Sequence, residues 1–253
     1  MIIPIGDDNR DRHITPFVNY IFIIINILVF IFLQDMARDE QFVYTYSTVP
    51  AEILTGRDIA GTYAFRHPIT NDLEYITLGK SNLPVYSTLL TSMFMHGGWA
   101  HLLGNMMFLW IFGDNIENDL GHRNYLIFYL LAGLLASLAH VFSTAFFGQN
   151  ELIPALGASG AISGVLGAYM IMHPKRRVHI WIFITIISVP GIIAVGLWFV
   201  FQVINGLGSL GGQEGGGVAY AAHIGGFIAG LIIIFFFPKI KPKQRRETVW
   251  ADR

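Results

Sequence analysis

A serine and a histidine occupy matching places in two apolar stretches of the chain. Ser159 lies 15 residues before a Pro-Lys pair at 174–175. His223 lies 15 residues before a second Pro-Lys pair at 238–239. If both pairs mark the same side of a membrane, a hydroxyl and an imidazole reach the same depth in the bilayer, where polar groups are costly and usually functional. The two residue types predict a nucleophile and its general base.

A second polar pair could serve the same chemistry. His101 and Asn105 are four residues apart and therefore share one face of a helix. An imidazole and an amide can both donate hydrogen bonds to an oxyanion; the alternative is that they hold neighbouring helices together. His96 lies in a His-Gly-Gly-Trp turn and is predicted to brace that turn or the site. His140 has no partner in the sequence and is interpreted as structural.

Small residues accompany both candidate residues, at Gly157, Gly160, Gly164 and Ala168 around Ser159, and at Gly226 and Gly230 after His223. Such faces let helix backbones approach closely, so a contact between the serine and the histidine is feasible. A helix that begins near Ser159 would also direct unpaired N–H groups and its positive dipole end at a developing oxyanion. Two alternatives stay open: Ser159 is only a packing residue, or Ser163, one turn further on, is the nucleophile.

Composition and hydropathy place these residues in an all-α membrane protein. Of 253 residues, 53% are hydrophobic and 13% are charged, whereas soluble domains carry about 25% charged residues. We predict one domain over 1–253, with a compact six-helix core at about 15–237, a short N-terminal tail at 1–14 and a basic C-terminal tail at 238–253. The predicted membrane helices are 17–33, 100–112, 125–147, 156–173, 178–201 and 219–237.

Local signals refine these helices. Thr15 and Pro16 suit the cap and first position of the first helix, and the stretch at 100–112 is short unless it continues past Gly113. Because no cleavage site is evident after it, the first stretch is interpreted as an anchored helix rather than a signal peptide. Pro190 predicts a kink in the fifth helix.

Charge and loop composition give the orientation. Twelve of the 16 Lys and Arg residues fall on the side of the two tails, and this predicts that both termini are cytoplasmic. The opposite first loop, 34–95, is too long for simple coil and is expected to form an interfacial substructure. Seven of the 16 residues at 202–217 are glycine, so this segment is predicted to be a mobile linker or a cap over the site.

Several functions are disfavoured by composition. The net charge of −1 suggests no nucleic-acid partner, and the absence of cysteine removes thiol chemistry. No metal-binding motif is present, so neither a metal nor another cofactor is expected. No acidic residue lies within an apolar stretch, so the expected catalytic unit is a Ser-His dyad rather than a triad with an acid.

These motifs together resemble the rhomboid family of intramembrane serine proteases. The matching segments are His-Gly-Gly-Trp-Ala-His-Leu-Leu-Gly-Asn at 96–105, Gly-Ala-Ser-Gly at 157–160 and Ala-His-x-x-Gly-x-x-x-Gly at 222–230, in the family's order. The resemblance implies a six-helix fold in which Ser159 is the nucleophile, in preference to Ser163, and His223 is its base. It also implies an oxyanion hole made by His101, Asn105 and the backbone N–H of Ser159.

The resemblance further implies structural roles and a substrate class. Gly160 would support the turn, and Gly226 and Gly230 would pack the sixth helix on the fourth. The substrates would be single-pass transmembrane proteins. Independently of the resemblance, the small size, the short tails and the lack of a targeting peptide favour a bacterial inner membrane as the location, with an organelle as the alternative. One departure is that Tyr86-Ser87 stands where many members have Trp-Arg.

Two rival functions remain. The first is an inactive relative that binds membrane clients. The second is a haem or ion-handling protein that uses His101, His140 and His223.

Overall fold

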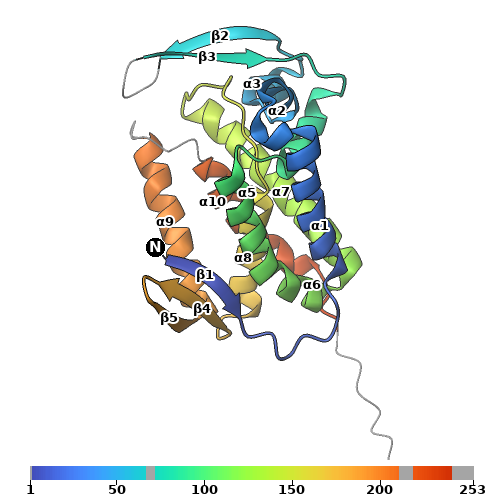
Figure 1. The fold of residues 1–253 in the computed structure, drawn as a ribbon, viewed down its shortest axis with the longest axis vertical. Helices are drawn as coiled ribbons and strands as arrows, with labels where there is room; N and C mark the ends of the chain where they lie inside the picture. Colours follow the sequence, from blue (N-terminus) through green and yellow to red (C-terminus); the bar gives the residue numbers. More distant parts are fainter. Residues whose placement is uncertain (1, 67–71, 211–218, 241–253) are drawn as a thin grey trace, which may run out of the picture.

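The computed structural model describes residues 2–66, 72–210 and 219–240 and is mostly helical, with a small sheet at each end (Figure 1). The helices are α1 (Phe17–Leu28), α2 (Glu40–Tyr46), α3 (Pro50–Thr55), α4 (Thr88–Thr91), α5 (Trp99–Phe108), α6 (Asp114–Leu120), α7 (His122–Phe146), α8 (Ser159–Met172), α9 (Gly191–Leu210) and α10 (Tyr220–Ile233). The strands are β1 (Ile2–Asp7), β2 (Gly61–Arg66), β3 (Leu73–Leu78), β4 (Arg177–Ile182) and β5 (Thr185–Pro190).

Most of the predicted apolar stretches are helical. By length and composition, α7 and the segment Gly191–Gly208 of α9 are long enough to cross a membrane. The segments Phe17–Leu33, Ser159–Met172 and Tyr220–Phe236 are shorter apolar helices. The π-helical segment Leu109–Gly113 joins α5 to α6, so the stretch that began at 100 does continue past Gly113.

The prediction of one kinked helix over 178–201 was wrong. This segment forms the β4–β5 hairpin, and α9 begins only after Pro190. The hairpin sequence is rich in β-branched and aromatic residues, which favour strands, and a continuous apolar run does not by itself distinguish a strand from a helix. α9 then continues to Leu210, so the first part of the predicted 202–217 loop is helical. Residues 211–217 of that loop lie outside the described residues.

The prediction of an all-α fold was therefore wrong in part. β1 pairs antiparallel with β4, so the segment expected to be a simple N-terminal tail is a strand of a three-stranded sheet with the order β1-β4-β5. At the opposite end, β2 and β3 form a separate hairpin. The first loop, 34–95, thus contains α2, α3, α4 and this hairpin, which confirms that it is a folded substructure. Of the predicted C-terminal tail, 241–253 lies outside the described residues.

The start of α1 is capped differently from the sequence prediction. The helix begins at Phe17, with Pro16 before it and no side-chain cap from that position. The buried carboxylate of Glu117 accepts the N–H of Val18 at 2.9 Å and that of Asn19 at 2.7 Å. A distant acidic side chain therefore takes the place assigned to Thr15, since a carboxylate at a helix N-terminus satisfies free N–H groups and the helix dipole together.

Asp7 fastens the end of β1 to the helical bundle. Its Oδ2 accepts hydrogen bonds from the Tyr169 hydroxyl at 2.7 Å and from the Asn115 amide at 3.0 Å. Burial raises the pKa of Asp7 above its ordinary value of 3.8, although the Tyr169 hydrogen bond and the Arg176 charge oppose the shift. The Asp7 carboxylate therefore joins the sheet to α8 at a cost in desolvation.

Candidate active site

α8 begins at Ser159, three residues after the start of the predicted stretch 156–173, because the preceding backbone makes a sharp turn. Gly157 has φ +125°, a conformation that residues with a side chain rarely adopt. Its N–H donates to the carbonyl of Ser92 at 2.8 Å, which ties this turn to the first loop. Ala158 follows and carries no side-chain group that could cap the helix. The N-terminal N–H groups of α8 are thus available to an anion beside Ser159.

The Ser159 hydroxyl and the His223 ring are in hydrogen-bond contact, with Oγ and Nε2 2.7 Å apart. The other ring nitrogen, Nδ1, lies 2.8 Å from Oε1 of Gln202 on α9. An amide oxygen can only accept, so Nδ1 carries the proton in the neutral ring and donates it to Gln202. This tautomer leaves Nε2 free to accept the hydrogen bond of the Ser159 hydroxyl. The arrangement suits proton transfer from serine to histidine.

Glycine contacts between α8 and α10 make this short distance possible. A Cβ on Gly226 would overlap the carbonyl oxygen of Gly160, and a Cβ on Gly230 would overlap that of Gly164. The two backbones therefore touch along two successive turns, as the repeat of small residues predicted. Because His223 precedes Gly226 by less than one turn, this close packing carries its ring toward Ser159.

His101 and Asn105 lie on α5 beside the same serine. The His101 Nδ1 accepts a hydrogen bond from the N–H of Gly97 at 3.3 Å, so in the neutral ring Nε2 carries the other proton. A Cβ on Gly157 would come 2.9 Å from that Nε2 and 3.5 Å from the Ser159 Oγ, so only the bare glycine separates the two groups. The His101 Nε2 therefore lies close to the space next to the Ser159 hydroxyl.

The side-chain amide of Asn105 is a donor that has no partner in the described part of the chain. Asn105 is buried, and among the residues that the structure describes its Nδ2 has no hydrogen-bond acceptor. Leaving such a group unpaired costs about 1–3 kcal/mol. A buried, unsatisfied donor on the same helix face as His101 is explained if the site is built to receive an anionic oxygen that is present only during reaction.

The turn that contains His96 is held by a residue that the sequence reasoning did not consider. The side chain of Gln34 donates to the His96 carbonyl at 2.9 Å and accepts its N–H at 3.0 Å. The His96 ring packs edge-on against His101 with their centroids 5.1 Å apart. Within the described ranges neither nitrogen of the His96 ring has a partner. His96 therefore supports His101 through packing and through its clamped backbone.

The remaining candidates from the sequence lie elsewhere. Ser163 is fully buried, and its hydroxyl donates to the Ser159 carbonyl at 2.6 Å, a bond within α8. This serine has no contact with His223 of the kind that activates a nucleophile. Both ring nitrogens of His223 are already engaged, so a haem iron would have to displace Gln202 or Ser159.

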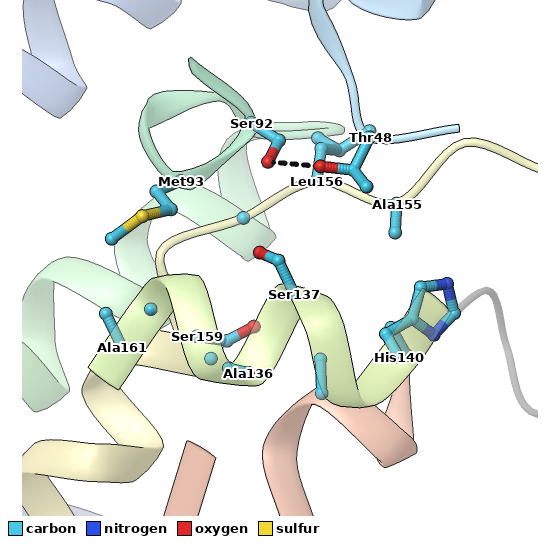
Figure 2. Close-up of a pocket in the computed structure, with 15 residues that line it drawn as sticks. Thr48, Ser92, Met93, Ala136, Ser137, His140, Ala155, Leu156, Ser159 and Ala161 are labelled. Carbon is cyan, nitrogen blue, oxygen red and sulfur yellow. Dashed lines mark hydrogen bonds between the residues drawn. The ribbon is translucent and has the colours of Figure 1, made fainter. Parts of the chain in front are cut away.

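A small cavity opens beside Ser159 and is bounded on one side by α7 (Figure 2). Its volume is about 30 Å³, enough for one or two water molecules. Most of the lining residues are glycine or alanine, and two larger apolar residues, Met93 and Leu156, also contribute. Besides Ser159, the polar lining residues are Thr48, Ser92, Ser137 and His140. Thr48 and Ser92 are hydrogen-bonded to each other at 2.9 Å. His140, which was interpreted as structural, therefore lines the cavity behind the candidate nucleophile.

A comparison with protein families agrees with this geometry. The Rhomboid domain matches residues 84–240, which is more than half of the chain and includes α5, α8, α9 and α10. The chain belongs to the rhomboid family. It is therefore a membrane protein and a homologue of the rhomboid serine proteases.

Individual relatives are bacterial and mitochondrial rhomboid proteins. The chain is 30% identical over 179 residues to "Rhomboid protein 1, mitochondrial" of Saccharomyces cerevisiae, which covers 70% of this chain and 49% of that protein. It is 38% identical over 136 residues to "Rhomboid protease GluP" of Bacillus subtilis, covering 53% of this chain and 25% of that protein. It is 28% identical over 188 residues to the human "Presenilin-associated rhomboid-like protein, mitochondrial", covering 72% of this chain and 44% of that protein. The chain thus spans half or less of the length of these curated relatives.

Gln202 is the main residue of the site that sequence reasoning missed. It lay at the edge of a segment interpreted as a loop, where no register relative to His223 could be assigned. A helix that begins at Gly191 places Gln202 three turns along α9. The signal that could have identified it is that Gln202 is the first polar side chain after an unbroken apolar run from Gly191 to Phe201.

Proposed function

We propose that this rhomboid protein is an intramembrane serine endopeptidase. The observation that carries the proposal is the 2.7 Å contact between Ser159 Oγ and His223 Nε2, in a site where Asn105 presents an unpaired donor. Membership of the rhomboid family supports the same conclusion. The substrates we propose are single-pass transmembrane proteins, because α8 and α10 are apolar helices and the site lies where they begin.

In the first step, Ser159 Oγ attacks the carbonyl carbon of the scissile peptide bond, and its proton passes to His223 Nε2. The His223 ring becomes cationic while its Nδ1–H stays bonded to Gln202, which holds the ring in place. General base catalysis of this kind contributes about 10²–10⁴-fold. Because Gln202 is neutral, the unit is a Ser-His dyad with an orienting amide rather than a triad with an acid.

The tetrahedral oxyanion would receive hydrogen bonds from His101 Nε2–H, Asn105 Nδ2–H and the backbone N–H of Ser159. Each such donor is worth roughly 2.7–4 kcal/mol in other serine hydrolases. His223 then gives its proton to the leaving amine and an acyl-enzyme ester remains. A water molecule attacks this ester, its proton goes to Nε2, and the serine is restored as the carboxylic acid leaves.

We further propose that the cavity beside Ser159 accepts the substrate side chain that precedes the scissile bond. Gly133, Ala136 and Gly160 are among the residues that line it, and its volume of about 30 Å³ suits a small side chain. The polar groups that also line it, including Ser137 and His140, offer hydrogen bonds to water for the second half of the reaction.

The membrane arrangement that we propose has six spans with both ends of the chain on the cytoplasmic side. α8 has 14 residues and is ~21 Å long at ~1.5 Å per residue, less than the ~30 Å of a hydrocarbon core. If its C-terminal end lies at the cytoplasmic surface, Ser159 lies below the opposite surface and is reached by water through protein. A bacterial inner membrane is the proposed location.

The test is cleavage of a single-pass transmembrane substrate in liposomes by the purified full-length chain. Ser159→Ala should abolish cleavage, whereas Ser163→Ala should retain it within a few-fold, since that hydroxyl bonds only to its own helix in the described part of the chain. Full activity of the Ser159→Ala variant, or loss of activity in the Ser163→Ala variant alone, would overturn the assignment.

A further inference from the structure

The β4–β5 hairpin has an unusual distribution of polar and apolar side chains. On the face that points away from the bundle, residues directly opposite each other are His179 with Ser188 near the base and Trp181 with Ile186 near the tip. His179 and Ser188 are hydrogen-bonded at 2.7 Å. The face is therefore polar at its base and apolar at its tip, whereas a hairpin in water is expected to be polar along its whole outer face.

The tip itself is apolar and exposed. The exposed fractions are 75% for Phe183, 100% for Ile184, 59% for Ile186 and 46% for Trp181. Phe183 and Ile184 form the two-residue turn, and Phe183 has φ +50°. Tight turns of this kind favour Asn, Asp or Gly, because these residues tolerate a positive φ. The sequence instead places a large apolar side chain there, against the local backbone preference.

The hairpin is continuous with an apolar stripe of α9. β5 ends at Pro190 and α9 begins at the next residue, with no linker between them. In Figure 1 the hairpin lies at the end of α9 and extends away from the other helices. Exposed apolar residues recur along α9 at about one helical turn, namely Ile193, Leu197, Phe201 and Ile204. In a membrane protein this stripe faces lipid, so the hairpin lies where the lipid-facing surface ends.

Cationic residues stand at the base of the same hairpin. Lys175 lies two residues before β4, and Arg177 is the first residue of the strand. Both side chains are exposed. Lys and Arg at a membrane surface are attracted to anionic headgroups, and tryptophan is enriched at the level of the headgroups. From base to tip, the order of chemistry is thus cation, neutral polar group, tryptophan and aliphatic residue, which matches the change from headgroup to acyl chain.

We propose that the β4–β5 hairpin is a lipid anchor, whose tip at Phe183 and Ile184 inserts below the headgroups of the leaflet at the C-terminal end of α8. The anchor fixes the position of α9 in the bilayer because the two are joined without a linker. α9 carries Gln202, so the anchor also sets the depth of the side chain that holds His223. The proposal rests on hairpin chemistry and does not require that the protein be a protease.

The test uses single-cysteine variants, which need no background removal because the chain has no cysteine. Ile184→Cys and, as a matched reference at the base, Lys175→Cys are labelled with an environment-sensitive fluorophore in liposomes. Lipids that carry a doxyl quencher near the glycerol or near the methyl end of the acyl chain report depth. Because Ile184 is fully exposed, its replacement removes no packing; Ile186→Cys provides a second reporter.

The lipid anchor predicts blue-shifted emission at position 184, with stronger quenching by the doxyl group near the glycerol than by the deeper one, and water-like emission at position 175. Water-like emission at 184 and 186 without lipid quenching would overturn the proposal. So would a signal at 184 that is shielded from lipid and grows with the protein-to-lipid ratio, because that result would mean that a second copy of the chain covers the tip.

Discussion

The unpaired amide of Asn105 leads to a prediction in which stability and activity change in opposite directions. Asn105→Leu replaces the buried amide by an apolar group of similar size. Because the Nδ2 has no partner among the described residues, its removal should relieve about 1–3 kcal/mol of desolvation and leave the fold as stable as before or more so. The same change removes one proposed oxyanion donor, which should lower kcat by about 10²–10³.

The matched control is Asn19→Leu, at an amide with its partners in place. The Asn19 Nδ2 donates to the Leu109 carbonyl at 2.9 Å, and its Oδ1 accepts the buried Tyr125 hydroxyl at 2.7 Å. Leucine at this position leaves the Leu109 carbonyl and the Tyr125 hydroxyl without their hydrogen-bond partner and should cost about 1–3 kcal/mol of stability. Since Asn19 lies outside the site, kcat of the folded protein should stay near that of the wild type.

Thermal unfolding in detergent and cleavage of a transmembrane substrate in liposomes measure the two quantities. The expected pattern is a Tm at or above the wild-type value with little activity for Asn105→Leu, and a lower Tm with activity kept for Asn19→Leu. If Asn105→Leu instead lowers Tm and keeps kcat within a few-fold, the amide only holds helices together and the proposed oxyanion hole is wrong.

Three further predictions concern other parts of the structure. Gln202→Leu should lower kcat roughly 2- to 10-fold with KM unchanged, because a neutral hydrogen bond to the histidine is worth about 0.5–1.5 kcal/mol net; Asn205→Leu, whose amide bonds to its own helix, is the control in the same cleavage assay. Gly226→Ala should lower the unfolding temperature by over-packing worth about 1–3 kcal/mol against a backbone carbonyl of α8. Gly196→Ala, where a Cβ meets open space, should stabilise the fold by about 0.5–1 kcal/mol and therefore raise the unfolding temperature. Asp7→Asn should stabilise the protein by an amount that grows with pH, as measured by unfolding temperatures over a pH series.

The sign of the Asp7 effect follows from its raised pKa. The wild-type carboxyl is most favourable to the fold below its ordinary pKa of 3.8, where it is protonated in both states. As pH rises through the higher folded-state pKa, the unfolded chain ionises first and this stability is lost. Asparagine at this position does not titrate. The difference in unfolding temperature between the variant and the wild type should therefore increase from pH 3.8 up to the folded-state pKa of Asp7. A gap that stays constant or narrows with pH would contradict the assigned cause.

The glutamine and glycine predictions are each contradicted if the variant and its control behave alike. If Gln202→Leu and Asn205→Leu lower kcat alike, the loss reflects α9 in general rather than the bond to the histidine. If Gly226→Ala and Gly196→Ala change the unfolding temperature with the same sign, the contact between α8 and α10 is looser than the structure shows.

Much of the site could be predicted because it depends on local spacing. The distance from Ser159 to the end of α8, the glycine repeats of α8 and α10, and the four-residue spacing of His101 and Asn105 are all properties of single helices. Helical geometry converts these spacings directly into the depth of each residue along its helix and the helix face on which it lies. The contact between Ser159 and His223 then follows once the two helices are adjacent.

Other features depend on partners that lie far away in the sequence. Glu117 caps α1 from nearly 100 residues away, and no local signal at Thr15 could show that. The β4–β5 hairpin is as apolar as a membrane helix, so hydropathy alone gave the wrong element. The same error hid the role of Gln202. The start of α9 determines which face of the helix this residue occupies, and the sequence placed that start too early.

The most direct test of the central claim is the site of modification by a serine-directed fluorophosphonate. The full-length protein in liposomes is labelled, digested, and the modified residue is located by mass spectrometry. We expect an adduct on Ser159 that disappears in His223→Ala, because Nε2 of that ring accepts the serine proton. An adduct on Ser163, or a folded protein that is not labelled, would contradict it.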